Sequence, residues 1–127
     1  MAFFEAHDDG GAVRITGNGQ RIPLADFGGL EPRTGTVLVG AWPEDIEVVS
    51  PGTANTSEGR IYAVDNRGFE RAVQINGAYG AFRKVLPHGV EMKQNDACAF
   101  RILDGAAFLF DAASGNRLSQ AHTEERA

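Results

Sequence analysis

The sequence predicts a small all-β domain, and three observations lead to this prediction. Sixteen glycines are spread over 127 residues, and the apolar runs between them are short. No long stretch repeats its apolar residues with the 3.6-residue period of a helix. Short apolar runs bounded by turn residues are typical of strands joined by tight turns. A chain of this length is expected to form one domain with its own hydrophobic core.

Composition and charge exclude several classes of protein. The net charge of −5 argues against a nucleic-acid-binding groove, which needs clustered Lys and Arg. Cys98 is the only cysteine, so no intrachain disulfide is possible and a reducing compartment is indicated. No apolar run reaches the length of a membrane span, and no signal segment opens the chain. We therefore expect a cytoplasmic protein with no nucleic-acid partner and no direct insertion into a membrane.

The central stretch of the chain combines a strand, a turn and a second strand. Thr36–Ala41 is nearly all apolar and contains three β-branched residues, which predicts a strand buried on both faces. Pro43 suits the first position of a single helical turn, where Glu44 and Asp45 would interact favourably with the helix dipole. Ile46–Val49 then returns the chain to the core.

The remaining apolar runs alternate with polar residues as strands do. In chain order, the expected strands are Ala12–Thr16 with Gln20–Leu24, Arg60–Asp65 with Phe69–Asn76, then Ala81–Leu86, Ala97–Leu103 and a strand within 106–118. Gly17 and Gly68 stand where the hairpin turns need a positive φ. Cys98 falls on the apolar side of its strand, so we expect it to pack as a small core residue.

Two motifs give the chain a family resemblance. The first is Gly-x-x-Pro-Glu-Asp-Ile at positions 40–46, and the second is Phe-x-Phe-Asp-x-x-Ser-Gly-x-Arg-Leu at 108–118. Together they resemble the motifs of the transport-associated oligonucleotide/oligosaccharide-binding-fold (TOBE) domain of sugar-type ABC importer ATP-binding subunits. The motif residues singled out as structural or interface residues are Gly40, Trp42, Pro43, Glu44, Phe110, Asp111, Ser114, Gly115, Arg117 and Leu118.

The resemblance implies a fold, a domain division and a set of partners. It implies an OB-like (TOBE/MOP-like) small β-barrel with short turns and at most one helical turn, spanning 1–118 and followed by a polar tail, 119–127. The family's domain regulates and dimerises the ATP-binding subunit, contacting a second copy of itself. The nucleotide-binding domain and the membrane permease are then further partners in the full transporter. The chain would lie in the cytoplasm, peripheral to the inner face of the membrane.

Two positions near the ends of strands leave alternatives open. The family usually carries Arg where this chain has Trp42. Either an apolar contact replaces an ion pair across a domain interface, or Trp42 packs on the barrel with its indole N–H bound to a carbonyl. Met1–Phe4 resembles the family's Met-Asn-Phe segment between the nucleotide-binding and regulatory domains, with Ala2 in place of Asn. Met1 is thus either an internal methionine of a longer protein or an ordinary start.

The sequence contains no motif for catalysis, a metal or a cofactor. It lacks the Gly-rich phosphate loop with its Lys-Ser/Thr pair, so we expect no ATPase activity from this chain itself. His7, His88 and His122 are scattered and do not have the spacing of a zinc site. A small-barrel enzyme built from scattered carboxylates stays a possibility that no motif supports. We therefore predict no cofactor, no metal and no catalytic residue.

One alternative function and one candidate site remain. Related transport-associated domains bind molybdate, so the chain could be a free-standing small-oxyanion (molybdate-type) binding protein. Such sites use backbone amides with Ser, Thr and Lys, and the chain has only Lys84 and Lys93. Arg60, Arg67 and Arg71 could form a basic patch on one hairpin, but the interleaved Asp and Glu favour a solvated face of mixed charge.

Overall fold

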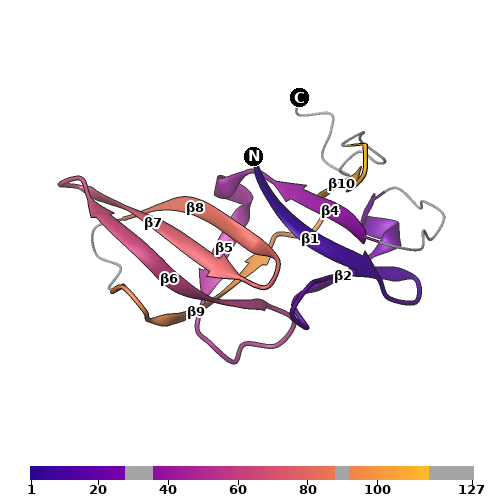
Figure 1. Ribbon diagram of the computed structural model, residues 1–127, viewed down its shortest axis with the longest axis horizontal. Helices are drawn as coiled ribbons and strands as arrows, with labels where there is room; N and C mark the ends of the chain where they lie inside the picture. Colours follow the sequence, from indigo (N-terminus) through magenta and orange to yellow (C-terminus); the bar gives the residue numbers. More distant parts are fainter. Residues whose placement is uncertain (28–35, 88–91, 115–127) are drawn as a thin grey trace.

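The computed structural model describes residues 1–27, 36–87 and 92–114, and within them the chain is built from short strands (Figure 1). The strands are β1 (Ala2–Asp8), β2 (Ala12–Ile15), β3 (Arg21–Pro23), β4 (Thr36–Ala41), β5 (Ile46–Val49), β6 (Ser57–Asn66), β7 (Glu70–Gly77), β8 (Gly80–Pro87), β9 (Ala97–Ile102) and β10 (Phe108–Asp111). Two 3₁₀ turns accompany them, η1 (Leu24–Phe27) and η2 (Pro43–Asp45). The predicted all-β class is confirmed.

The described strands form two antiparallel sheets of five strands each. Sheet A has the order β10-β4-β1-β2-β3, and sheet B has the order β5-β9-β6-β7-β8. Figure 1 shows β1, β2 and β4 of sheet A on one side of the molecule and β6, β7 and β8 of sheet B on the other. The chain crosses between the sheets twice, from β4 through η2 to β5 and from β9 to β10.

The two sheets are built on the same plan, with one strand exchanged. Replacing β1–β4 by β6–β9 converts the order of sheet A into that of sheet B, provided that β5 and β10 change places. We call β1–β5 the first half of the chain and β6–β10 the second half. The last strand of the first half, β5, belongs to sheet B, and the last strand of the second half, β10, belongs to sheet A. Neither sheet is complete without a strand from the other half.

Apolar side chains from both sheets meet in one core. β1 alternates buried and exposed residues, as a strand with one solvated face does. Phe4 of β1 packs against the rings of Tyr79, Phe82 and Phe100 of the second half, with centroids 5.5, 5.1 and 5.0 Å away. The backbone N–H of Glu5 donates to the carbonyl of Tyr79 at 3.0 Å and joins the sheets at this point. This aromatic cluster therefore fixes sheet A on sheet B.

Two glycines make room for the Tyr79 ring of that cluster. A Cβ atom at Gly77 would lie 2.4 Å from ring carbons of Tyr79, and one at Gly59 would lie 2.5 Å from its hydroxyl oxygen. Both distances are shorter than van der Waals contact allows, so a larger residue would displace the ring. Burial raises the pKa of the Tyr79 hydroxyl, which is 4% exposed. The small residues thus let the β7–β8 turn fold back onto its own hairpin.

Most strand predictions are confirmed, including the pairing of β2 with β3 and of β6 with β7. The single turn expected at Pro43 is η2, with an extended residue before it and Pro at its first position. Cys98 is a buried core residue, and burial, aided by the charge of Asp96, raises the pKa of its thiol to about 11. A thiol with a raised pKa is a poor nucleophile, as expected for a structural cysteine.

Two local predictions need correction. A second helical turn, η1, begins at Leu24, where the sequence analysis expected a strand and then a connection. Leu24 and Phe27 are both buried, because residues three apart lie on one side of a 3₁₀ turn. The strand expected to begin at Phe69 begins at Glu70, and Phe69 is 91% exposed. Among the described residues, no helix is long and apolar enough to cross a membrane.

Candidate functional site

The fold brings the two motifs of the sequence together in one strand pair. β10 pairs with β4 antiparallel, which places Phe108 opposite Gly40 and Phe110 opposite Leu38. Since the strands are antiparallel, the turn that follows β4 and the turn that follows β10 lie at opposite ends of the pair. The two motifs therefore meet along the paired strands, although they lie far apart in the chain, and their turns lie at the two ends of the pair.

Gly40 sits under an aromatic pair on the outer face of sheet A. A Cβ atom at this position would lie 2.8 Å from Sδ of Met1 and from Cε1 of Phe110, and 3.3 Å from Cε1 of Phe3. The rings of Phe3 and Phe110 meet edge to face, with centroids 5.3 Å apart. We call Met1, Phe3 and Phe110 the aromatic patch. The glycine is thus needed for close approach of these side chains.

The turn after β4 presents a large aromatic side chain to solvent. Trp42 has an extended backbone, and its carbonyl accepts a hydrogen bond of 2.9 Å from the N–H of Asp45. Trp42 is 45% exposed, so the packing that would bury it on its own barrel is incomplete. Lys84 of β8 donates from Nζ to the carbonyl of Pro43 at 2.7 Å, which holds the turn against sheet B. Glu44 is exposed at the same turn.

The second motif forms a turn after β10. The carboxylate of Asp111 accepts a hydrogen bond of 2.8 Å from the Ser114 hydroxyl and a longer one, 3.4 Å, from the N–H of Ala113. Asp is favoured in turns because its side chain can bind the backbone a few residues on. The other three motif residues, Gly115, Arg117 and Leu118, lie outside the described residues. Among the predicted site residues that the structure describes, Asp111 and Ser114 meet within the second motif, and Gly40 and Phe110 are the pair that meets across the two motifs.

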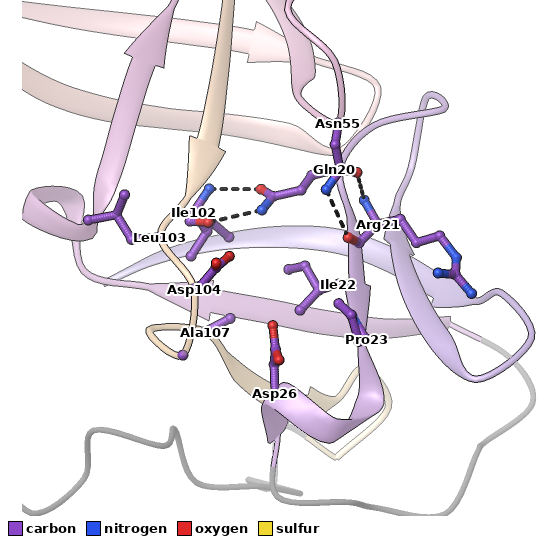
Figure 2. Close-up of a pocket in the computed structure, with 11 residues that line it drawn as sticks. Gln20, Arg21, Ile22, Pro23, Asp26, Asn55, Ile102, Leu103, Asp104 and Ala107 are labelled. Carbon is purple, nitrogen blue, oxygen red and sulfur yellow. Dashed lines mark hydrogen bonds between the residues drawn. The ribbon is translucent and has the colours of Figure 1, made fainter.

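A pocket that the sequence did not indicate lies where β3 meets the end of β9. It has a volume of about 480 Å³, and its floor contains Gln20, which is 5% exposed. The Gln20 side chain donates from Nε2 to the carbonyl of Ile102 at 2.9 Å and accepts from the N–H of the same residue at 2.7 Å. Figure 2 shows both hydrogen bonds, with Asp26 and Asp104 on the two sides of the pocket. We call this the acidic pocket.

The rim of the acidic pocket is held by further polar contacts. Asn55 accepts from the N–H of Arg21 at 2.8 Å and donates to its carbonyl at 3.3 Å (Figure 2). The Arg21 side chain turns away to Asp9, at 3.2 Å. Sequence reasoning missed this site because its carboxylates come singly from separate turns, a pattern that most surface loops share. Among the described residues, no three His, Cys, Asp or Glu side chains are grouped to hold a metal.

The architecture is that of the small all-β domains with the TOBE/MOP-like fold, as the resemblance implied. It is similar to the crystal structure of the cytoplasmic molybdate-binding protein ModG with molybdate bound, with a TM-score of 0.61. The match covers 85% of this chain and 94% of that chain at 11% sequence identity, so it shows the fold alone. No family model matches the sequence. No curated protein matches it either.

Proposed function

We propose that this chain is a regulatory and dimerisation domain of the ATP-binding subunit of an ABC transporter, and that this transporter imports a carbohydrate or a related small solute. The supporting observation is the pairing of β4 with β10, which joins the two TOBE-like motifs in one strand pair. In this proposal the chain has no ATPase activity of its own, and the nucleotide-binding domain and the permease are its partners in the transporter.

The exposed side chains around this strand pair support a protein-contact role. Phe3 is 45% exposed beside Phe110, and Trp42 is exposed to the same extent on the turn beyond β4. Large aromatic residues at a surface are typical anchors of protein interfaces. A two-fold contact must be self-complementary, so a second copy would place the same residues on both sides. Trp42 would supply an apolar contact where the related domains carry Arg.

Self-association of the chain tests the dimerisation part of the proposal. Sedimentation velocity over a wide concentration range should show a weak monomer–dimer equilibrium. Trp42→Arg should weaken it by about tenfold or more, the effect of losing one interface anchor. Tyr62→Arg is the matched control, because Tyr62 is an exposed aromatic of sheet B, away from the proposed contact. A strictly monomeric native chain, or equal effects of both variants, would refute the assignment of Trp42.

The transporter part of the proposal has a separate test. The reading frame that encodes this chain, together with its neighbours in the genome, should include an ABC nucleotide-binding domain and a permease. A genomic setting without either gene would count against the proposal.

The alternative function is small-oxyanion binding of the molybdate type. The fold likeness to a molybdate-binding protein favours it, but at 11% identity it carries no binding residues across. Calorimetry with molybdate and with sulfate separates the two functions. Tight, saturable binding of molybdate that sulfate does not match would favour the alternative.

A further inference from the structure

A pocket lies beside each of the two connections that cross between the sheets. The acidic pocket lies between β3 and the connection from β9 to β10. The plan that replaces β3 by β8 also replaces this connection by the one from β4 to β5. A second pocket of about 450 Å³ lies beside that connection, lined by residues of β8 and of η2, by Arg67 of the β6–β7 turn and by Ala72 of β7. Each pocket thus lies beside one of the two connections that cross between the sheets.

Each pocket contains a polar side chain that bonds to the backbone near a connection between the sheets. In the acidic pocket, Gln20, just before β3, binds the backbone of Ile102 at the end of β9. In the second pocket, Lys84 of β8 binds the carbonyl of Pro43, just after β4. Each side chain ties one sheet to the chain segment that is leaving the other. The first pocket uses a neutral amide for this contact, and the second uses a cation.

The two pockets differ in the sign of their net charge. Asp26, Asp104 and Arg21 line the first, and the Arg21 side chain is engaged by Asp9. Arg67, Arg83 and Lys84 line the second together with Glu44, and we call it the basic pocket. A chain of net charge −5 has gathered three of its twelve cations at this one site.

The three cations of the basic pocket differ in the groups that already contact them. Arg83 is exposed and forms no ion pair with any described residue, and Arg67 is shared with Asp65 at 3.1 Å. Lys84 is half-buried, and it donates a hydrogen bond to the neutral carbonyl of Pro43. Desolvation lowers the pKa of Lys84, against the opposing attraction of Glu44 and Asp45. An anion close to Lys84 would compensate this desolvation, because an opposite charge favours the charged form.

We propose that the basic pocket binds a small hydroxylated phosphate monoester. Arg and Lys are the side chains that bind phosphate oxygens most strongly, Arg through its planar fork and Lys as a point charge. A volume of about 450 Å³ lies in the range of small-molecule sites and leaves room for an organic body beside the phosphate. Pro43, Ala72 and Val85 give that body apolar walls, and Glu44 can accept hydrogen bonds from hydroxyl groups.

This site is independent of the proposed transporter role and is tested on the chain alone. Calorimetry uses three probes: glucose 6-phosphate, inorganic phosphate and glucose. We expect one saturable site for glucose 6-phosphate, binding about tenfold weaker for inorganic phosphate, and none for glucose at the same concentrations. Absence of saturable binding of glucose 6-phosphate at millimolar concentration would overturn the proposal. Equal affinity for inorganic phosphate would overturn the claim that the pocket recognises an organic body.

Variants locate the binding site within the chain. Arg83→Gln should weaken glucose 6-phosphate binding about tenfold or more, and because Arg83 is exposed this variant is expected to fold. Lys84→Gln should weaken binding similarly, with folding checked by circular dichroism. Lys93→Gln removes an exposed cation outside the pocket and is the matched control. Equal loss in Arg83→Gln and Lys93→Gln would show non-specific attraction, and a loss caused by Asp26→Asn would place the ligand in the acidic pocket instead.

Discussion

At the scale of single residues, the Gln20 side chain replaces the backbone of a neighbouring strand as the hydrogen-bond partner of Ile102. Its amide donates to the carbonyl and accepts from the N–H of one residue, Ile102, as a neighbouring strand would. The Gln20 backbone N–H is in turn satisfied by the hydroxyl of Ser57, at 3.0 Å. A single buried side chain thus closes the backbone hydrogen bonding at the point where β9 leaves sheet B.

Gln20→Leu should therefore be among the more destabilising single changes. It leaves a buried donor and a buried acceptor of Ile102 without a partner, at a cost of roughly 1–3 kcal/mol for each unsatisfied group. Urea unfolding measures the loss. Gln94→Leu is the control, since Gln94 is exposed and its replacement should change stability by less than about 0.5 kcal/mol. Similar stabilities for the two variants would show that Ile102 finds other partners.

Asp9 gives the stability of the chain a defined dependence on pH. Its carboxylate accepts hydrogen bonds from Nε of Arg14 at 3.1 Å and of Arg21 at 3.2 Å. The hydrogen bond from Arg14 is the main cause that holds the Asp9 pKa below its usual 3.8. A lowered folded-state pKa contributes stability above the unfolded-state pKa, and this contribution is lost as pH falls through the folded-state value.

Asp9→Asn should accordingly destabilise the chain at neutral pH and have little effect in acid. The difference between native and variant should shrink as pH falls below about 4, where the unfolded-state carboxyl begins to take up its proton. Thermal melts at a series of pH values measure it. Asp65→Asn is a comparison variant, because Asp65 lies in an exposed pair with Arg67 for which little net stabilisation is expected. A gap that is constant with pH would contradict the role assigned to Asp9.

At the scale of elements, the β7–β8 hairpin depends on the close packing of Gly77 against the ring of Tyr79. Gly77→Ala would drive a methyl group into Tyr79, which is already packed against Phe4 and Phe100. Overpacking of this kind costs about 1–3 kcal/mol. Tyr79→Leu removes the ring and is destabilising by itself, but in its presence Gly77→Ala should cost much less. Simple additivity of the two changes in a double-mutant cycle would refute the contact.

Some of these elements could be predicted from the sequence, and others could not. The alternation of Phe82 and Leu86 with Arg83 and Val85 predicted β8 correctly, because a hairpin strand with one buried face repeats every two residues. The turn η1 could not be predicted, since four residues are too few to display a helical period. The strand start expected at Phe69 was one residue early, because alternation does not define where a strand starts.

The candidate site was predictable only in part. Gly40 and Phe110 belong to motifs, and their contact was found where the two motifs pair. The acidic and basic pockets each combine side chains from segments that are distant in the chain. Their position depends on the exchange of β5 and β10 between the sheets, a non-local pairing that leaves no trace in local patterns of polarity. No motif search could have found them.

At the scale of the whole molecule, the exchange makes the two halves one cooperative unit. Each sheet contains a strand from the other half, and the aromatic cluster around Phe4 joins both. We expect a single unfolding transition, in which Trp42 fluorescence and far-ultraviolet circular dichroism report the same midpoint in urea. Two separate transitions, one for each sheet, would contradict the interlocked arrangement.

The exchange also has a consequence for the order in which the protein is made. During synthesis, β1–β4 leave the ribosome early, but the neighbour of β4 at the edge of sheet A is β10, about seventy residues later in the chain. Until β10 arrives, β4 is an unpaired edge that holds Val37, Val39 and free backbone groups. Exposed apolar edges pair readily with other chains. A nascent chain stalled before Phe108 would then leave this edge open to the β10 of another chain that has not yet folded, and the strand that normally completes sheet A within one molecule would join two.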